Sequence, residues 1–213
     1  RALSSAANNS ARCGFIDQLW STTSSIFLPW IFGAGLLAGC ASAPERPLPP
    51  REQIKNFALE ARFALRVLNP GKAAQSSGGR LSWIQNNGQS HLLISNPLGI
   101  GVAEIAIQPG HAVLHASNGE SRESDNPDLL LEEVTGLRLP VTRIADWLLG
   151  RHAGQGKISR DFAGRPQHFE DAGWRVDYEY ESEAADALPS KLTIIRDGEI
   201  ELRLRIETWK DAP

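Results

Sequence analysis

The chain contains no methionine and only two cysteines, Cys13 and Cys40. Cys13 lies in an N-terminal region that we expect to be removed, so the remaining chain would form no intramolecular disulfide. No apolar run reaches the roughly 20 residues that a membrane-spanning helix needs. Charge is nearly balanced, with 22 basic and 25 acidic residues. A nucleic-acid partner is therefore disfavoured, and any membrane contact must be apolar or covalent, because both nucleic acid and anionic lipid attract basic surfaces.

Cys40 follows an apolar run from Ile26 to Ala38. About thirteen residues are too few to cross a bilayer but fit the apolar core of a secretory signal, which is about 7–15 residues long. The ending Leu-Ala-Gly-Cys resembles the bacterial lipobox, in which the thiol receives a diacylglycerol, the chain is cut before the cysteine and the new amino group is acylated. We therefore predict lipidation at Cys40. The alternative is a chance cysteine after an ordinary signal or a buried helix.

Three segments are expected. Residues 1–39 form a leader and lipoprotein signal peptide, although Asp17 and the length of this region indicate an over-extended or misplaced start. Residues 40–51 form the lipidated cysteine and a proline-rich tether, which reaches about 30 Å at ~3.1 Å per residue. Residues 52–213 form one domain with a core, beginning with a helical turn or two before residue 57.

Alternating apolar and polar side chains dominate that domain. The clearest run is 59–68, where period two predicts a strand with one apolar face. Asn86-Asn87-Gly88 indicates a tight turn, and 71–79 indicates a polar loop. Further strands are expected at 80–85, 90–95, 102–107, 111–116, 157–161, 167–171 and 174–180, and in the two segments that flank Asp197-Gly198. The pattern predicts an antiparallel meander.

Two short helices interrupt the strands. Asn126-Pro127 supplies a capping side chain and a proline at the first helical position, and Gly136 ends this helix. A second helix is expected from Val141 to Leu149, with Ile144, Trp147 and Leu148 at positions i, i+3 and i+4. Two amphipathic helices in a meander must cover a sheet face or the mouth of a barrel.

The sequence offers no catalytic or metal-binding constellation. His111 and His115 share a strand face without further ligands. Residues 154–157 lack the leading glycine and the hydroxyl residue of a phosphate loop, and 99–101 lead into a strand instead of a helix. The acidic pair 132–133 is typical of a solvated helix face. We therefore expect neither an enzyme nor a cofactor. Two interpretations of the sheet remain open: a core filled permanently by the helices, or a covered apolar cavity.

Three stretches occur in the order found in LolB, the family of outer-membrane lipoprotein receptors: 92–99 (LLISNPLG), 134–141 (VTGLRLPV) and 147–150 (WLLG). Residues 173–178 (GWRVDY), Leu188-Pro189 and the alternation ending in Ile206 and Trp209 resemble its C-terminal half, and Arg62 resembles the arginine of its opening strand. The resemblance spans nearly all of 52–209.

The resemblance implies a mainly β, α+β fold: an open antiparallel β-barrel of about eleven strands with a helical lid over an apolar cavity. It implies a monomer at the periplasmic face of the outer membrane, anchored by lipid, which accepts triacylated lipoproteins from the periplasmic carrier LolA and inserts them into outer-membrane lipid. No cofactor is implied. Ala41, in place of the aspartate that marks inner-membrane retention, agrees with outer-membrane sorting. The alternative is an envelope lipoprotein that acts as a scaffold or binds another hydrophobic ligand.

On this interpretation apolar side chains line the cavity, and helix residues form its lid. The expected lining is Phe63, Leu65, Trp83, Ile94, Trp174, Val176, Leu202 and Leu204; the expected lid is Leu130, Ile144, Trp147 and Leu148. Leu98 sits between Pro97 and Gly99, in a short turn where a large apolar residue has little reason to be. By resemblance it is an exposed leucine that touches the membrane during insertion; the alternative is an anchor folded back onto the core.

Overall fold

The computed structural model describes residues 48–68, 71–152 and 156–212. The leader, Cys40 and the tether up to residue 47 lie outside the described residues. Among the residues that are described, neither helix has the length and apolar character needed to cross a bilayer.

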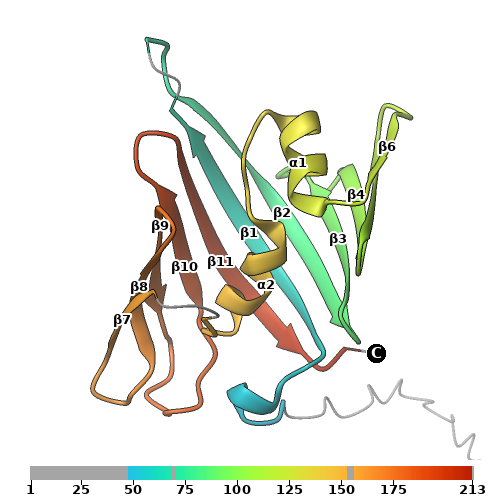
Figure 1. Cartoon of the computed structure of the whole chain (residues 1–213). Helices are drawn as coiled ribbons and strands as arrows, with labels where there is room; N and C mark the ends of the chain where they lie inside the picture. Colours follow the sequence, from blue (N-terminus) through green and yellow to red (C-terminus); the bar gives the residue numbers. More distant parts are fainter. Residues whose placement is uncertain (1–47, 69–70, 153–155, 213) are drawn as a thin grey trace, which may run out of the picture. The chain divides into compact units, whose positions relative to one another are not determined.

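The domain is built on one antiparallel sheet (Figure 1). Its strands are β1 (Phe57–Val67), β2 (Gln75–Asn86), β3 (Gln89–Ser95), β4 (Gly101–Gln108), β5 (His111–Ala116), β6 (Ser121–Ser124), β7 (Lys157–Arg160), β8 (Pro166–Asp171), β9 (Trp174–Glu179), β10 (Lys191–Arg196) and β11 (Ile200–Lys210). Their order is β6-β5-β4-β3-β2-β1-β11-β10-β9-β8-β7. The edge strands β6 and β7 do not pair, so the sheet is open, as expected.

Two helices lie against the concave side of this sheet (Figure 1). Helix α1 (Pro127–Thr135) contacts β5, β6 and the second helix, α2 (Val141–Leu148). The strands and helices confirm the predicted fold class, an open eleven-stranded antiparallel sheet with short helices. Among the described residues before β1, from 48 to 56, the chain makes one 3-10 turn, η1 (Arg51–Gln53), which is shorter than the predicted helical turns.

The predicted loop at 71–79 is wrong in its second half. Strand β2 begins at Gln75 and pairs with β1 from Val67↔Gln75 onward. This part of β2 is QSSGG, so it carries no apolar alternation by which the sequence could reveal it. Its pairing with β1 imposes the extended backbone instead. The polar strand β6 was missed for the same reason.

One end of the sheet, which we call the tether end, carries η1 and the start of β1. The Asn87-Gly88 turn lies there, because its backbone N–H at Asn87 donates to Asn56 Oδ1 over 3.0 Å. Both turn residues have positive φ, 49° and 79°, as a two-residue hairpin turn requires. The β7–β8 turn and the β9–β10 connection also lie there, at the bottom of Figure 1. We call the opposite end, where β1 and β3 finish, the far end.

The core is solid toward the tether end and loosens toward the far end. Along β1, Phe57, Leu59 and Ala61 are fully buried, whereas Phe63 and Leu65 are only partly buried. Aromatic contacts close the tether end, including an edge-to-face pair of Phe57 with Trp209 of β11, with centroids 5.5 Å apart. The apolar face that the alternation predicts is therefore incompletely filled at one end.

Candidate functional site

An apolar cavity of about 360 Å³ lies between the sheet and the helices. Its lining holds two hydroxyl residues and no charged one: Phe63, Leu65, Ser77, Leu81, Trp83, Leu92, Ile94, Val102, Ala103, Ile105, Leu114, Ala116, Leu131, Val134, Thr135, Leu137, Leu139, Val141, Ile144, Leu202 and Leu204. The Thr135 hydroxyl already donates to the carbonyl of Leu131 over 2.5 Å. Such a surface recognises hydrocarbon and offers a polar ligand few partners.

Strand register explains both the floor and the hollow. Trp83, Leu92, Ile105 and Leu114 face one another across β2 to β5 and make a row of large side chains. In a row nearer the far end, Ile94 of β3 is paired with Ala103, and Ala103 with Ala116. Two alanines leave space where larger side chains would fill it, so the cavity deepens over this second row.

The helices close the opposite wall. Helix α1 begins at Asn126, whose Oδ1 accepts from the backbone N–H of Asp128 at 3.0 Å and of Leu129 at 3.2 Å. It ends at Gly136, which has the left-handed φ of 69°. The Asp128 carboxylate then accepts from the backbone N–H of Thr142 in α2 at 3.2 Å, which ties the two helices together.

Six of the eight expected cavity residues line this space: Phe63, Leu65, Trp83, Ile94, Leu202 and Leu204. The structure places the other two elsewhere. Trp174 and Val176 are buried nearer β7 to β10, where the Trp147 ring covers Trp174 with centroids 6.1 Å apart. They share the buried face of the sheet, but helix α2 packs directly on that part.

Of the expected lid residues, Ile144 contacts the cavity. Leu130 of α1 and Trp147 and Leu148 of α2 are buried in the core and do not line the cavity. The helical side of the cavity also includes residues outside the expected lid: Leu131, Val134, Leu137, Leu139 and Val141. The i, i+3 spacing of Leu131 and Val134 was the available signal for a second apolar stripe on α1.

Leu98 is 87% exposed on the turn between β3 and β4. The Asn96 side-chain oxygen accepts from the backbone N–H of Leu98 at 2.9 Å and of Ile100 at 3.0 Å. Gly99 supplies a φ of 86°. These bonds fix the turn, so Leu98 points into solvent and is not folded back onto the core.

The same turn borders the cavity at the far end. Ile100 is 62% exposed, and Val102, which is 45% exposed, also lines the cavity. Val134 of α1 is likewise both exposed and part of the lining. Apolar surface therefore continues from the cavity, over its rim, to the turn that carries Leu98. A continuous apolar path suits a ligand that must pass from the interior to a lipid surface.

None of the charged or histidine side chains that the structure describes lines the cavity. His152 lies near the tether end, where burial first and then the positive charges of Arg160 and Arg51 lower its pKa to about 4. His168, on the convex side, has a raised pKa because it bonds to Asp177 at 2.6 Å. Within the described ranges, no three His, Cys, Asp or Glu side chains gather as metal ligands would.

Comparisons with known proteins give consistent matches. A family model described as "LolB: Outer membrane lipoprotein LolB" matches residues 55–209. An "Outer-membrane lipoprotein LolB" of Dechloromonas aromatica (strain RCB) is 56% identical over 178 residues, which cover 84% of this chain and 94% of the relative. One of the same name from Halorhodospira halophila (strain DSM 244 / SL1) is 32% identical over 195 residues, covering 85% and 93%.

Among solved structures, the LolA superfamily protein NE2245 from Nitrosomonas europaea aligns with a TM-score of 0.39 at 10% identity, covering 73% of this chain and 86% of that chain. The family model itself takes in both helices and every strand except the final residue of β11.

Proposed function

Because the chain belongs to the LolB family of outer-membrane lipoproteins, we propose that its apolar cavity shelters the acyl chains of a lipoprotein on their way into the outer membrane. The chain is an outer-membrane lipoprotein receptor and not an enzyme. Its cargo is lipoprotein, and its donor is a carrier of the LolA type.

Transfer through water is too costly to be the route. A triacylated cargo carries three chains of about 16 carbons, and each exposed CH₂ costs about 0.8 kcal/mol. Release into water therefore costs tens of kcal/mol. The chains must pass from one apolar site to another and then into lipid, so the receptor needs an interior that hydrocarbon can enter.

The observation that carries the proposal is the uncharged cavity and its continuous apolar rim. Its volume, about 360 Å³, is near the lower end of ligand pockets, which run from roughly 300 to 1,000 Å³. Three acyl chains need more room, so loading must move α1 and the 136–140 connection away from the sheet. The unpaired edge β6, which α1 contacts, allows this movement without breaking the central strand pairs.

Delivery begins at Leu98. Its turn holds an apolar side chain in solvent, where it can enter the bilayer surface and bring the rim of the cavity to lipid. Cys40, the proposed site of the lipid anchor, keeps the chain at the outer membrane, and the tether gives the domain its reach. A monomer suffices, because cavity, rim and turn belong to one chain.

A handover assay tests the proposal. A carrier loaded with radiolabelled lipoprotein is mixed with the full-length chain, and complexes are separated by an affinity tag on the receptor. We expect the label to move to the receptor and then to added liposomes. A scaffold, or a binder of another hydrophobic ligand, would leave the lipoprotein on its carrier, and that outcome overturns the receptor mechanism.

A further inference from the structure

Phe162 is 87% exposed on the β7–β8 turn, at the end of the domain opposite the Leu98 turn. The hydrogen bonds that form the turn come from other residues. The Asp161 carboxylate accepts from the backbone N–H of Ala163 at 3.0 Å and of Arg165 at 2.9 Å, and Gly164 supplies a φ of 79°. A large apolar ring at such a position needs an explanation other than turn formation.

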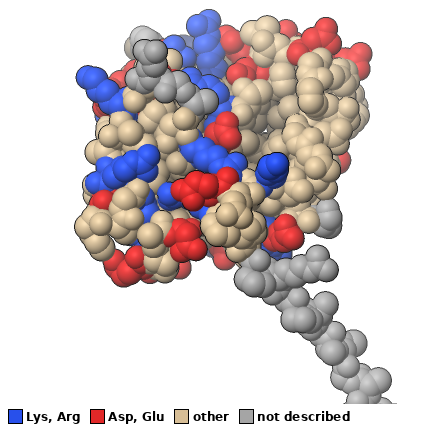
Figure 2. All heavy atoms as spheres, turned by 60° about the horizontal axis from the view of Figure 1, so that its bottom comes forward, with Lys and Arg blue, Asp and Glu red and all other residues tan. Residues whose placement is uncertain are grey.

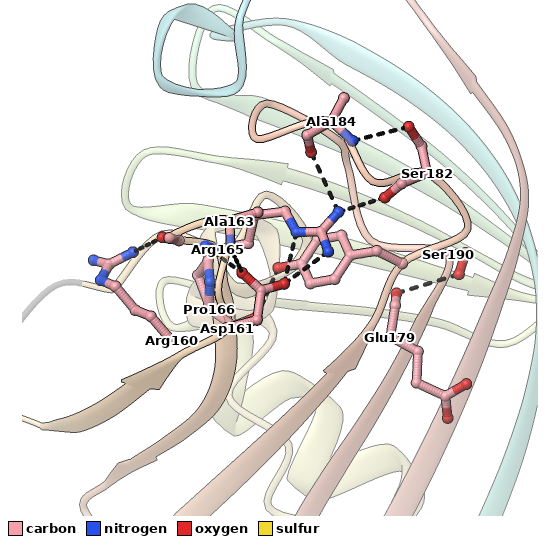
Figure 3. A network of polar contacts seen from close by, with 11 residues as sticks. Arg160, Asp161, Ala163, Arg165, Pro166, Glu179, Ser182, Ala184 and Ser190 are labelled. Atoms are coloured by element: carbon pink, nitrogen blue, oxygen red, sulfur yellow. Dashed lines mark hydrogen bonds and ion pairs between the residues drawn. The ribbon is translucent and has the colours of Figure 1, made fainter.

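A network of polar contacts holds the turn that carries Phe162 (Figure 3). The Arg165 guanidinium is buried, pairs with the Asp161 carboxylate at 2.7 Å and lies 4.3 Å over the Tyr180 ring. It also donates to the carbonyls of Ser182 and Ala184 in the β9–β10 connection. The turn is thereby fixed to the neighbouring loop, and Phe162 is held outward.

The first described residues of the chain lie at this end of the domain. Leu48 packs against the core at the start of the described residues, and Arg51 follows in η1. Cys40 is eight residues before Leu48. At the ~3.1 Å per residue of an extended proline-rich segment, eight residues span about 25 Å. An anchor at Cys40 therefore holds the tether end, and Phe162 with it, close to the bilayer.

A basic pocket of about 370 Å³ opens beside the turn. Its lining includes three arginines, Arg51, Arg151 and Arg160, and one acidic residue, Glu52. Arg51 is only 6% exposed; its Nη2 pairs with Glu52 at 3.4 Å, whereas its Nη1 has no hydrogen-bond partner among the residues that the structure describes. A guanidinium N–H left without a partner can donate to an anionic oxygen. Phosphate groups at a phospholipid surface supply such oxygens.

We propose that the tether end is a phospholipid-contacting surface, in which Phe162 enters the bilayer interface and the pocket of Arg51 and Arg160 faces lipid phosphates. Figure 2 shows this end: basic and acidic side chains are interspersed, so contact depends on the aromatic ring and the local pocket more than on net charge. The inference rests on the anchor at Cys40 proposed above.

Before delivery, with Phe162 at the bilayer, the cavity rim and Leu98 at the far end point toward the periplasm, where a loaded carrier arrives. Phe162 then serves acceptance, and Leu98 serves delivery once the domain has turned over on its tether. The two side chains have the same exposure, 87%, which makes them a matched pair for an experiment.

The experiment uses the processed, lipidated protein in vesicles of phosphatidylethanolamine and phosphatidylglycerol, without cargo. Single variants Phe162→Cys and Leu98→Cys are labelled with an environment-sensitive fluorophore, and the unsubstituted chain reports any labelling of native cysteines. Vesicles are floated first, and quenching by headgroup-region nitroxide lipids is then measured. We expect quenching at least about twofold stronger at position 162 than at position 98.

Equal quenching, or stronger quenching at position 98, overturns the inference, because the domain then rests with its other end on lipid. A chain that does not float overturns the anchor and this inference together. Strong quenching at position 162 in a chain that fails the handover assay supports the lipid-contacting surface and overturns the receptor mechanism instead. The two proposals can therefore fail separately.

Discussion

Phe63 of β1 lies directly opposite Gly79 of β2, and its ring covers the space where a side chain at position 79 would stand. A Cβ at Gly79 would lie 2.0 Å from the carbonyl oxygen of Ser95 and 3.0 Å from the Phe63 ring. Only glycine allows β1, β2 and β3 to pair at this point while Phe63 turns its ring into the cavity.

Gly79→Ala is expected to lower the free energy of unfolding by about 1–3 kcal/mol, the range for overpacking, because the contact at Ser95 is backbone and cannot rotate away. Denaturant unfolding measures the change.

The matched control is Gly101→Ala in β4, where the nearest atom, Leu93 Cδ1, would be 4.0 Å from the new Cβ. That substitution should leave stability unchanged or raise it by about 0.4–1 kcal/mol. Equal loss of stability in the two variants would show that Gly79 has no special packing role.

Gly79 also marks the limit of what the sequence could predict. Strands with alternating apolar residues, such as 59–68, were found from period two alone. The segment Gln75–Gly79 pairs with β1 for its whole length, yet it is polar and small, so local pattern predicts a loop. Its strand conformation is imposed by pairing with β1, and the glycine at position 79 leaves room for the Phe63 ring.

The sequence could predict which face of each strand is buried, but not which part of that face borders a cavity. Alternation correctly places Leu202 and Val176 on the buried face, but it carries no information on which part of that face a helix covers. Val176 packs in the filled part of the core, whereas Leu202 lines the cavity. The difference depends on the paired alanines, Ala103 and Ala116, and on where α2 packs. Leu98, in contrast, was open to prediction because its turn chemistry is local.

Leu98→Glu should block delivery without harming the fold. Exchanging leucine for an acidic residue disfavours insertion into lipid by about 3 kcal/mol at full depth, so we expect transfer to liposomes to slow at least about tenfold. Acceptance of lipoprotein from the carrier should be unchanged, because the side chain points into solvent.

The control for this variant is Leu129→Glu. Leu129 is also exposed and lies in the first turn of α1, where glutamate suits the helix N-terminus. Delivery by this variant should be normal. Normal delivery by Leu98→Glu as well would remove the turn from the mechanism.

His152 should make the domain less stable in acid. Its pKa is lowered to about 4 in the folded chain, against about 6.5 in the unfolded chain, so the unfolded state binds more protons between these values. Stability is fully present above about 6.5 and declines as the pH falls toward about 4. Because solvent screens a half-exposed ring, we expect only part of the maximal slope of ~1.4 kcal/mol per pH unit.

His152→Gln should reduce this slope in urea unfolding measured from pH 7 to pH 4.5, whatever its effect on stability at pH 7. His168 acts in the opposite direction, because its raised pKa adds stability as the pH falls, so the comparison of slopes between variant and parent is the informative quantity. His115→Gln, at an exposed position of β5, serves as control. An unchanged slope in His152→Gln would contradict the assignment.

The paired alanines allow a direct test of the cavity. Ala103 and Ala106 are both in β4, but only Ala103 faces the cavity. Ala103→Leu adds three carbons to the hollow, and each displaced CH₂ of a ligand is worth about 0.8 kcal/mol. Binding of a fluorescent fatty acid should therefore weaken at least about tenfold. The melting temperature should stay level or rise, because the new side chain fills space that is otherwise empty.

Ala106→Leu adds the same volume to the opposite face of the strand and should leave fatty-acid binding unchanged. Comparing the two variants separates occupancy of the cavity from any general disturbance of β4. If Ala103→Leu bound the fatty acid as tightly as the parent, hydrocarbon would have to enter elsewhere, and the row of Ile94, Ala103 and Ala116 could not be the place where acyl chains are received.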